Sequence, residues 1–124
     1  MKPNDFESFR AAFPGLFARE YSKREPFFGF DLPPGWSDLV WELCEKLEPL
    51  GVQAAQVKEK FGGLRFYTNG LLAPGVLDHI QAAEKLSFKT CQDCGAPGTT
   101  GNKTKWLFAT LCPAHMPPQT REEP

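Results

Sequence analysis

Four residues near the C-terminus have the types and the spacing of metal ligands. Two residues separate Cys91 from Cys94, and two residues separate Cys112 from His115. Ligands spaced in this way can turn back on one tetrahedral ion, with zinc–sulfur distances near ~2.3 Å and zinc–nitrogen distances near ~2.0–2.1 Å. Gly95 follows the first pair, where a tight turn often needs a positive φ. The pattern predicts one closed site of three cysteines and one histidine, and four protein ligands indicate a structural metal.

Disulfides or free thiols are the alternative reading of these cysteines. The first five residues are polar and lack the apolar core of a signal peptide, and no run of residues approaches a membrane span. We therefore expect a cytoplasmic protein, in which stable disulfides are disfavoured and metal binding is favoured. Zinc is expected over an iron–sulfur cluster because one ligand is a histidine. His79 is the reserve donor if His115 does not bind the metal.

The composition fits one compact α+β domain over residues 1–116, followed by a flexible tail over residues 117–124. With 124 residues, 41% of them hydrophobic, the chain can form a core without a metal. Its twelve prolines and eleven glycines predict long irregular connections. We expect two or three helices, a β-hairpin and a C-terminal zinc-ribbon-like module over residues 87–116, docked on the body of the domain.

Two helices are predicted in the first half of the chain. Asp5 can cap a short helix that carries phenylalanines at helical spacing and ends at Pro14-Gly15. The clearest helix runs from Trp36 to Leu47, because its apolar residues recur at i, i+3, i+4, i+7 and i+8. Between the two helices, residues 22–35 contain too many prolines and glycines for regular structure.

Two residues of the second helix have predicted roles. Cys44 lies in the apolar stripe, so we expect it to be a small buried hydrophobic residue and not a fifth ligand. Trp41 lies outside the stripe, next to a face of acidic residues. Because tryptophan is enriched at interface hot spots, Trp41 is a candidate contact for a partner.

Residues 52–69 predict a β-hairpin that turns at Gly62-Gly63, since such a dipeptide supplies the positive φ of a tight turn. In this register Phe61 faces Leu64 and both pack inward, while Glu59 points to the same apolar side. The opposite side is a small basic face of four residues: Lys58, Lys60, Arg65 and Tyr67. This basic face suits phosphate or an acidic partner, although like charges also protect an exposed sheet.

The last third of the chain predicts a helix, a loop and a strand. The helix opens with Pro74 and ends near Leu86, and its inward residues are expected to be Val76, Leu77, Ile80, Ala83 and Leu86. Residues 98–104 are polar and rich in glycine, which predicts a loop. Residues 105–111 predict a strand that carries apolar residues on both sides. A strand covered twice implies that the metal module is docked on the body.

Several of these motifs together resemble a group of small phage and prophage proteins of uncharacterised function. The resemblance is carried by Gly35-Trp36 leading to Leu43-Cys44, the string from Val57 to Tyr67, and Thr90-Cys91 with the closing Leu111-Cys112 pair. It spans roughly residues 35–115, and this chain has His115 where a second cysteine pair is expected in such proteins. The resemblance implies an origin on a mobile element inside a bacterial cell, and it implies no activity.

The leading functional hypothesis is a zinc-stabilised, non-enzymatic binding protein that acts through protein–protein contact, with a host factor as partner if the phage resemblance holds. The net charge of −1 gives no general attraction to a polyanion. The alternative is a nucleic-acid-binding zinc module that uses the basic face. A metal-dependent hydrolase comes third, since no motif places a nucleophile or a phosphate loop. We expect neither a membrane nor a small-molecule substrate as partner.

Overall fold

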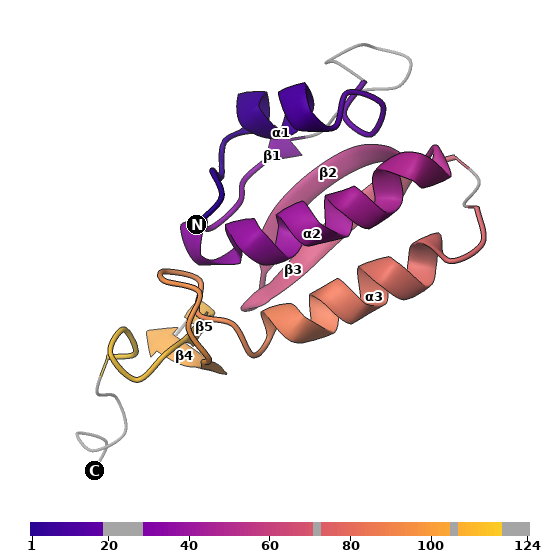
Figure 1. The fold of residues 1–124 in the computed structure, drawn as a ribbon. Coiled ribbons are helices and arrows are strands. Elements are labelled where there is room, and N and C mark those ends of the chain that lie inside the picture. The colour runs from indigo at the N-terminus through magenta and orange to yellow at the C-terminus, as the bar shows by residue number, and fades with distance from the viewer. Residues whose placement is uncertain (19–28, 71–72, 105–106, 118–124) are drawn as a thin grey trace.

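The computed structural model describes residues 1–18, 29–70, 73–104 and 107–117, and it confirms the predicted α+β class (Figure 1). In the described residues, three helices accompany a three-stranded sheet and a separate two-stranded sheet. The elements are α1 (Phe6–Ala12), β1 (Gly29–Phe30), α2 (Ser37–Leu47), β2 (Gln53–Lys60), β3 (Gly63–Asn69), α3 (Val76–Ser87), β4 (Thr99–Thr104) and β5 (Leu107–Leu111), with 3-10 turns at Pro34–Trp36 and Glu48–Leu50. None of the helices in these ranges has the length and apolarity of a membrane span. The predicted tail lies outside the described residues from residue 118 on.

The three-stranded sheet has the order β1-β2-β3, with β1 parallel and β3 antiparallel to β2. Helices α2 and α3 run side by side over one face of this sheet (Figure 1). The core between them contains Val40, Leu47, Val57, Leu64 and Ile80, all of which are buried. This packing confirms the predicted stripe of α2 and its buried Cys44. The short strand β1 lies in the segment for which we predicted no regular structure, and residues 19–28 of that segment are outside the described residues.

The N-terminal helix packs on Trp41 of α2. Asp5 caps α1 as predicted, and its carboxylate accepts a hydrogen bond from the Ser8 N–H at 2.9 Å. The Trp41 ring makes edge contacts with Phe9 and Phe13, at centroid distances of 5.0 and 4.9 Å. The Lys2 ammonium lies 5.0 Å from the centre of the same ring. Much of the Trp41 surface is therefore used within the chain, to hold α1 against α2.

The hairpin is present, but the predicted turn is wrong by one residue. Lys60 pairs with Gly63, so the two-residue loop is Phe61-Gly62 and not Gly62-Gly63. Both loop residues have a positive φ, of 55° and 84°, as a type I′ turn requires. Gly63 is needed inside the strand, because a Cβ there would overlap the Phe88 ring. Phe61 is therefore 62% exposed instead of buried, in a conformation that costs a bulky residue about 1–2 kcal/mol.

Glu59 stabilises this turn. Its side chain points to the apolar side of the hairpin, as predicted, and its carboxylate accepts a hydrogen bond from the Gly62 N–H at 2.7 Å. A charge-assisted bond of this kind is stronger than a bond between neutral groups. The acidic residue that interrupts the apolar pattern is therefore part of the turn.

The predicted third helix differs from α3 at both ends. It begins at Val76, after Gly75 with a φ of 88°, and not at Pro74. Two of the residues predicted to face inward, Leu77 and Leu86, are 51% and 48% exposed. Ser87 is buried instead. The helical pattern cannot distinguish these positions, because the surface that α3 covers is set by β3, a distant segment.

Two polar side chains of α3 bind the backbone of β3. The Ser87 hydroxyl accepts a hydrogen bond from the Leu64 N–H at 2.8 Å. The Glu84 carboxylate accepts one from the Phe66 N–H at 3.2 Å. Among the described strands, β3 pairs only with β2, so these two bonds satisfy amides that point away from the sheet. They also fix α3 along the length of β3.

The predicted loop over residues 98–104 is wrong, because residues 99–104 form β4. This strand pairs with β5 in antiparallel register, from Thr99 opposite Leu111 to Thr104 opposite Leu107. Several of its residues are threonine, which favours strands once a partner strand is available. We predicted that both faces of β5 are buried. This is true only of its last residues, since Thr110 and Leu111 are buried while Leu107 is half exposed.

Candidate metal centre

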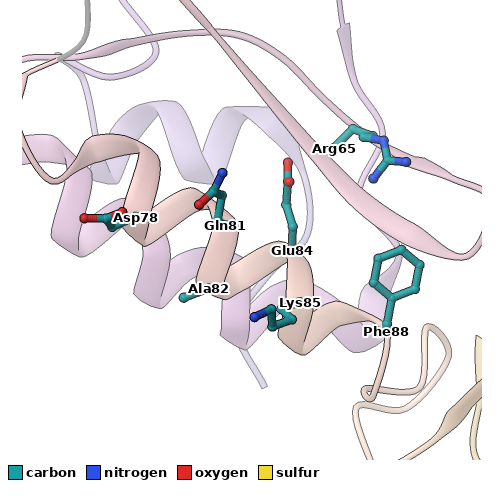
Figure 2. Close-up of a pocket in the computed structure, with 7 residues that line it drawn as sticks. All are labelled: Arg65, Asp78, Gln81, Ala82, Glu84, Lys85 and Phe88. Atoms are coloured by element: carbon teal, nitrogen blue, oxygen red, sulfur yellow. The ribbon is translucent and has the colours of Figure 1, made fainter.

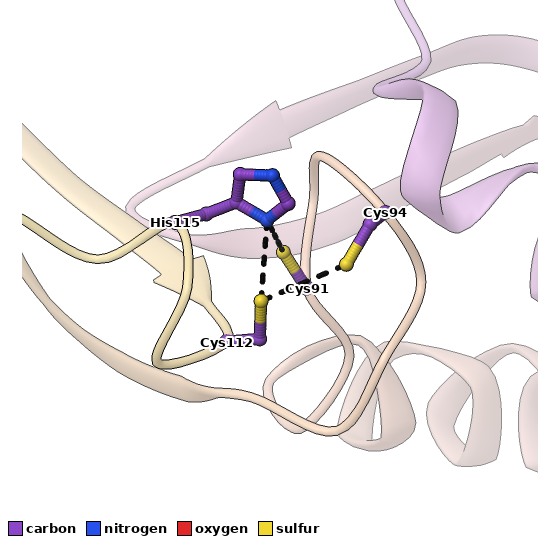
Figure 3. A group of neighbouring side chains, drawn as sticks. All are labelled: Cys91, Cys94, Cys112 and His115. Carbon is purple, nitrogen blue, oxygen red and sulfur yellow. Dashed lines mark hydrogen bonds between the residues drawn. The ribbon is translucent and has the colours of Figure 1, made fainter.

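The structure brings the four predicted ligands together at one point of the metal module (Figure 3). Their ligand atoms all lie within 4.8 Å of one another. His115 Nδ1 lies 3.6 Å from Cys91 Sγ and 3.2 Å from Cys112 Sγ, and Cys94 Sγ lies 3.6 Å from Cys112 Sγ. A tetrahedral zinc ion would place sulfur pairs about 3.8 Å apart and sulfur–nitrogen pairs about 3.6 Å apart. The four side chains can therefore hold one metal ion.

Each ligand pair lies on a tight backbone turn. In the first turn the Gly95 N–H donates to Cys91 O at 2.9 Å, and Gly95 has the predicted positive φ, at 83°. In the second turn the N–H groups of His115 and Met116 donate to Cys112 O, at 3.0 and 2.9 Å. The β4-β5 hairpin lies between the two turns and brings them side by side (Figure 1). The sequence spacing is thus sufficient to form the site once β4 and β5 pair.

The surroundings of Cys91 and Cys112 favour thiolates, which are the form that binds a metal. At Cys94 the Ala96 N–H lowers the pKa, but burial and the Cys112 and Cys91 sulfurs outweigh it and raise this pKa. Burial raises the pKa of Cys91, but the backbone N–H groups of Cys112, Cys94 and Asp93 outweigh it and lower this pKa to about 6. Burial likewise opposes ionisation of Cys112, whereas its hydrogen bonds to His115 and Cys94 lower its pKa. The pKa of His115 is raised by its bonds to the Cys112 and Cys91 sulfurs. Cys91 and Cys112 therefore supply the thiolate charge that attracts a cation.

The first turn is fixed to the start of α2 by close backbone contact. The Gly35 N–H donates to Gln92 O at 2.7 Å, and the buried Trp36 indole N–H donates to Thr90 O at 2.8 Å. A Cβ on Gly35 would overlap Cys91 O and would lie 2.7 Å from the carbonyl carbon of Gln92. Only glycine permits this approach, so the ligand Cys91 is held directly against the body of the domain.

A second contact between the metal module and the body connects β5 to the tip of the β2-β3 hairpin. The buried Thr110 hydroxyl donates to Gly62 O at 2.6 Å. The Thr110 backbone N–H donates to the Gln92 side chain at 2.7 Å, so that β5 and the first ligand turn are also joined. The hairpin tip and the metal module consequently support each other.

The reserve donor His79 and the fourth cysteine, Cys44, are not part of this centre. His79 is half buried in a groove between α2 and α3, and it is not grouped with the cysteines. Burial, with the nearby carboxylates of Glu48 and Glu45, raises the pKa of Cys44 well above its ordinary value. Cys44 therefore remains a neutral thiol in the apolar core, as predicted.

The four residues of the predicted basic face do lie on one face of the hairpin. Lys58 stands directly opposite Arg65 across the two strands, and Tyr67 is opposite Gln56. Lys60 and Tyr67 are exposed, whereas Lys58 and Arg65 are half buried. Trp41 lies elsewhere, on α2 beneath α1. The structure thus separates the two surfaces that the sequence offered as partner contacts.

Sequence reasoning missed an exposed apolar surface at the hairpin tip, which we call the tip patch: Phe61 and Phe108. These side chains are 62% and 48% exposed. The Phe61 and Phe108 rings make an edge contact at 6.5 Å, and the Lys60 ammonium lies 5.5 Å from the centre of the Phe61 ring. The clue in the sequence was the phenylalanine before Gly62-Gly63, which the predicted turn placed in the core.

A groove between β3 and α3 lies on the other side of Arg65 (Figure 2). Arg65 and Lys85 line it together with Asp78 and Glu84, and Phe88 closes one end. Glu84 is already bonded to the backbone of β3. Because both cationic and anionic side chains line this groove, it has no preference for a cation or an anion.

Comparisons with protein-family models, curated proteins and solved structures gave no match to this chain. The properties of the site therefore rest on its own geometry and chemistry.

Proposed function

We propose that the chain is a zinc-stabilised, non-enzymatic binding protein. The observation that carries the proposal is the cluster of three sulfurs and one imidazole nitrogen within 4.8 Å. Thiolate and imidazole ligands suit zinc, and a set of four protein ligands is typical of structural sites, since catalytic zinc usually keeps an open position. On this proposal the ion stabilises the module that supports the hairpin tip.

The binding surface lies on the hairpin side of the domain in this proposal. Trp41 was the first candidate from the sequence, but its ring is occupied by Phe9, Phe13 and Lys2. The tip patch is exposed and adjoins the basic face through Lys60. Exposed aromatic side chains beside cations are typical of contacts with other macromolecules. The resemblance to phage and prophage proteins adds the proposal of a partner inside a bacterial cell.

Metal analysis tests the proposal directly. Protein purified without a chelator should contain one zinc ion per chain by elemental analysis. Cys112→Ser should lose the ion and should unfold at a lower temperature, because a site that forms only on folding contributes its binding energy to the fold. Cys44→Ala is the matched control, since it removes a cysteine from the core and should leave the zinc content unchanged.

Two results would refute the structural role of zinc. The first is metal-free protein that unfolds at the same temperature with and without added zinc. The second is a bound ion that remains after Cys91→Ser and Cys112→Ser are combined.

A further inference from the structure

The tip patch combines two features that are locally unfavourable. Phe61 has a φ of 55°, a region in which a bulky side chain is a genuine outlier and asparagine is common. Lys58 stands directly opposite Arg65 on neighbouring strands, and like charges in this position repel. Local features that oppose stability are often found at functional sites.

On the basic face, the charged side chains of β2 and β3 have one sign. The side chains that β2 and β3 direct to the basic face include Lys58 and Lys60 but no acidic residue, because Glu59 points to the other side. No ion pair in the described ranges engages Lys58 or Lys60 with a carboxylate. Arg65 differs, since Asp78 and Glu84 line the same groove (Figure 2). Lys58 and Lys60 are therefore the cations available to an anionic ligand.

The aromatic rings of the patch are placed for stacking. The Phe61 and Phe108 rings meet edge to face, at an interplanar angle of 78°. In such a contact the edge of one ring covers one face of the other ring, so the remaining ring faces are not used by it. Both side chains are about half exposed or more. Two rings form a small apolar surface, whereas a stable protein interface usually takes about 20–30 residues from each side. An unpaired base can stack on a single aromatic ring, and every base can do so because each has a π face.

We propose that the tip patch and the basic face bind single-stranded nucleic acid. Phe61 and Phe108 stack on unpaired bases, while Lys58 and Lys60 contact the phosphates that connect them. This inference rests on the proposed function, because β5 carries Phe108 and supports the turn of Phe61 through the bond from Thr110 to Gly62. The partner is recognised by its charge and its stacking surfaces, without selection of a base sequence.

Fluorescence anisotropy of the zinc-loaded full chain tests the inference. The probe is a labelled oligothymidylate of about 20 nucleotides, longer than the ~4–16 nucleotides that one small binding domain usually covers. Phe61→Asn should weaken binding about 5- to 150-fold, the loss that corresponds to ~1–3 kcal/mol of stacking for one base. Asparagine accepts a positive φ more readily, so the unfolding temperature should not fall. Leu77→Ala, which shortens an exposed side chain on α3 far from the patch, should leave binding unchanged.

The salt dependence tests the role of the lysines. For single strands, the plot of log affinity against log salt changes in slope by about 0.7 for each phosphate contact. Replacing Lys58 and Lys60 by glutamine should therefore make this slope shallower by about 1.4. An unchanged slope would refute their assignment as phosphate ligands.

Three results would overturn the inference: no binding of the oligonucleotide at low salt, equal affinity for a duplex, or unchanged affinity after Phe61→Asn. The inference would also be overturned if the zinc-loaded chain did not bind nucleic acid and lost a protein partner on Phe61→Asn. That result would leave the proposed function intact. A chain that contains no zinc would instead refute the proposed function.

Discussion

Gly35→Ala should uncouple the metal module from the body of the domain. The added Cβ would overlap Cys91 O and approach the Gln92 carbonyl carbon to 2.7 Å, and both are backbone atoms that cannot rotate away. Overpacking of this kind costs about 1–3 kcal/mol. The hydrogen bond from Gly35 N to Gln92 O would be strained or lost, at a further cost of about 0.5–1.5 kcal/mol. We expect a total loss of about 2–4 kcal/mol in the free energy of unfolding.

Thermal and denaturant unfolding of the zinc-loaded protein measure this loss. The unfolding temperature should fall by about 8–16 °C, at roughly 4 °C for each kcal/mol in a domain of this size. Zinc affinity should fall as well, because the displaced backbone carries the ligand Cys91. Gly101→Ala is the matched control in the same module, since the nearest atom to its Cβ would be Met116 Cε at 3.6 Å. Equal stability of the two variants would refute the argument that close backbone contact holds the module in place.

Three further predictions follow from individual contacts. Ser87→Ala should lower the free energy of unfolding by about 1–3 kcal/mol in a denaturant titration, because it leaves the buried Leu64 N–H without an acceptor. Removal of the metal with a chelator should break the bond from the Trp36 indole to Thr90 O and shift tryptophan emission to longer wavelength, while the far-ultraviolet signal of the helices is largely kept. The Ser8 backbone N–H, with the Ser8 hydroxyl, lowers the pKa of Asp5 below its ordinary 3.8. The stabilisation of α1 by this cap is therefore complete above about pH 3.8 and is lost as the pH falls through the lower folded value. Asp5→Asn should remove that step from the pH dependence of the Ser8 amide resonance.

The sequence was sufficient to predict the cluster of three cysteines and one histidine and helix α2. The spacing of Cys91 with Cys94 and of Cys112 with His115 is a local pattern that suits two tight turns, and the pairing of β4 with β5 brings these turns together. The apolar stripe of α2 is likewise a local pattern. What joins the centre to the domain could not be predicted, because the approach of Gly35 to Cys91 connects residues that are far apart in the chain.

The errors at the hairpin and at β4 have the same origin in contacts between distant residues. A turn at Gly62-Gly63 has a lower local conformational energy than one that forces Phe61 to a positive φ. Phe88 decides the register, since its ring covers Gly63 and leaves no room for a side chain there. The glycine-rich residues of β4 look like a loop until β5 pairs with them. The contacts of Trp41 with Phe9 on α1 and with Phe13, which follows α1, likewise join residues that are distant in the chain.

The bonds from α3 to β3 also limit how this protein can associate. An extended segment that adds to a sheet must bond to free N–H groups on the outer strand. At this edge the N–H groups of Leu64 and Phe66 already donate to Ser87 and Glu84. The side of β3 that faces α3 is therefore closed to strand addition, which protects it from edge-to-edge aggregation and excludes peptide recognition by β-augmentation there. A partner that approaches this edge of β3 at Leu64 and Phe66 must be recognised through side chains.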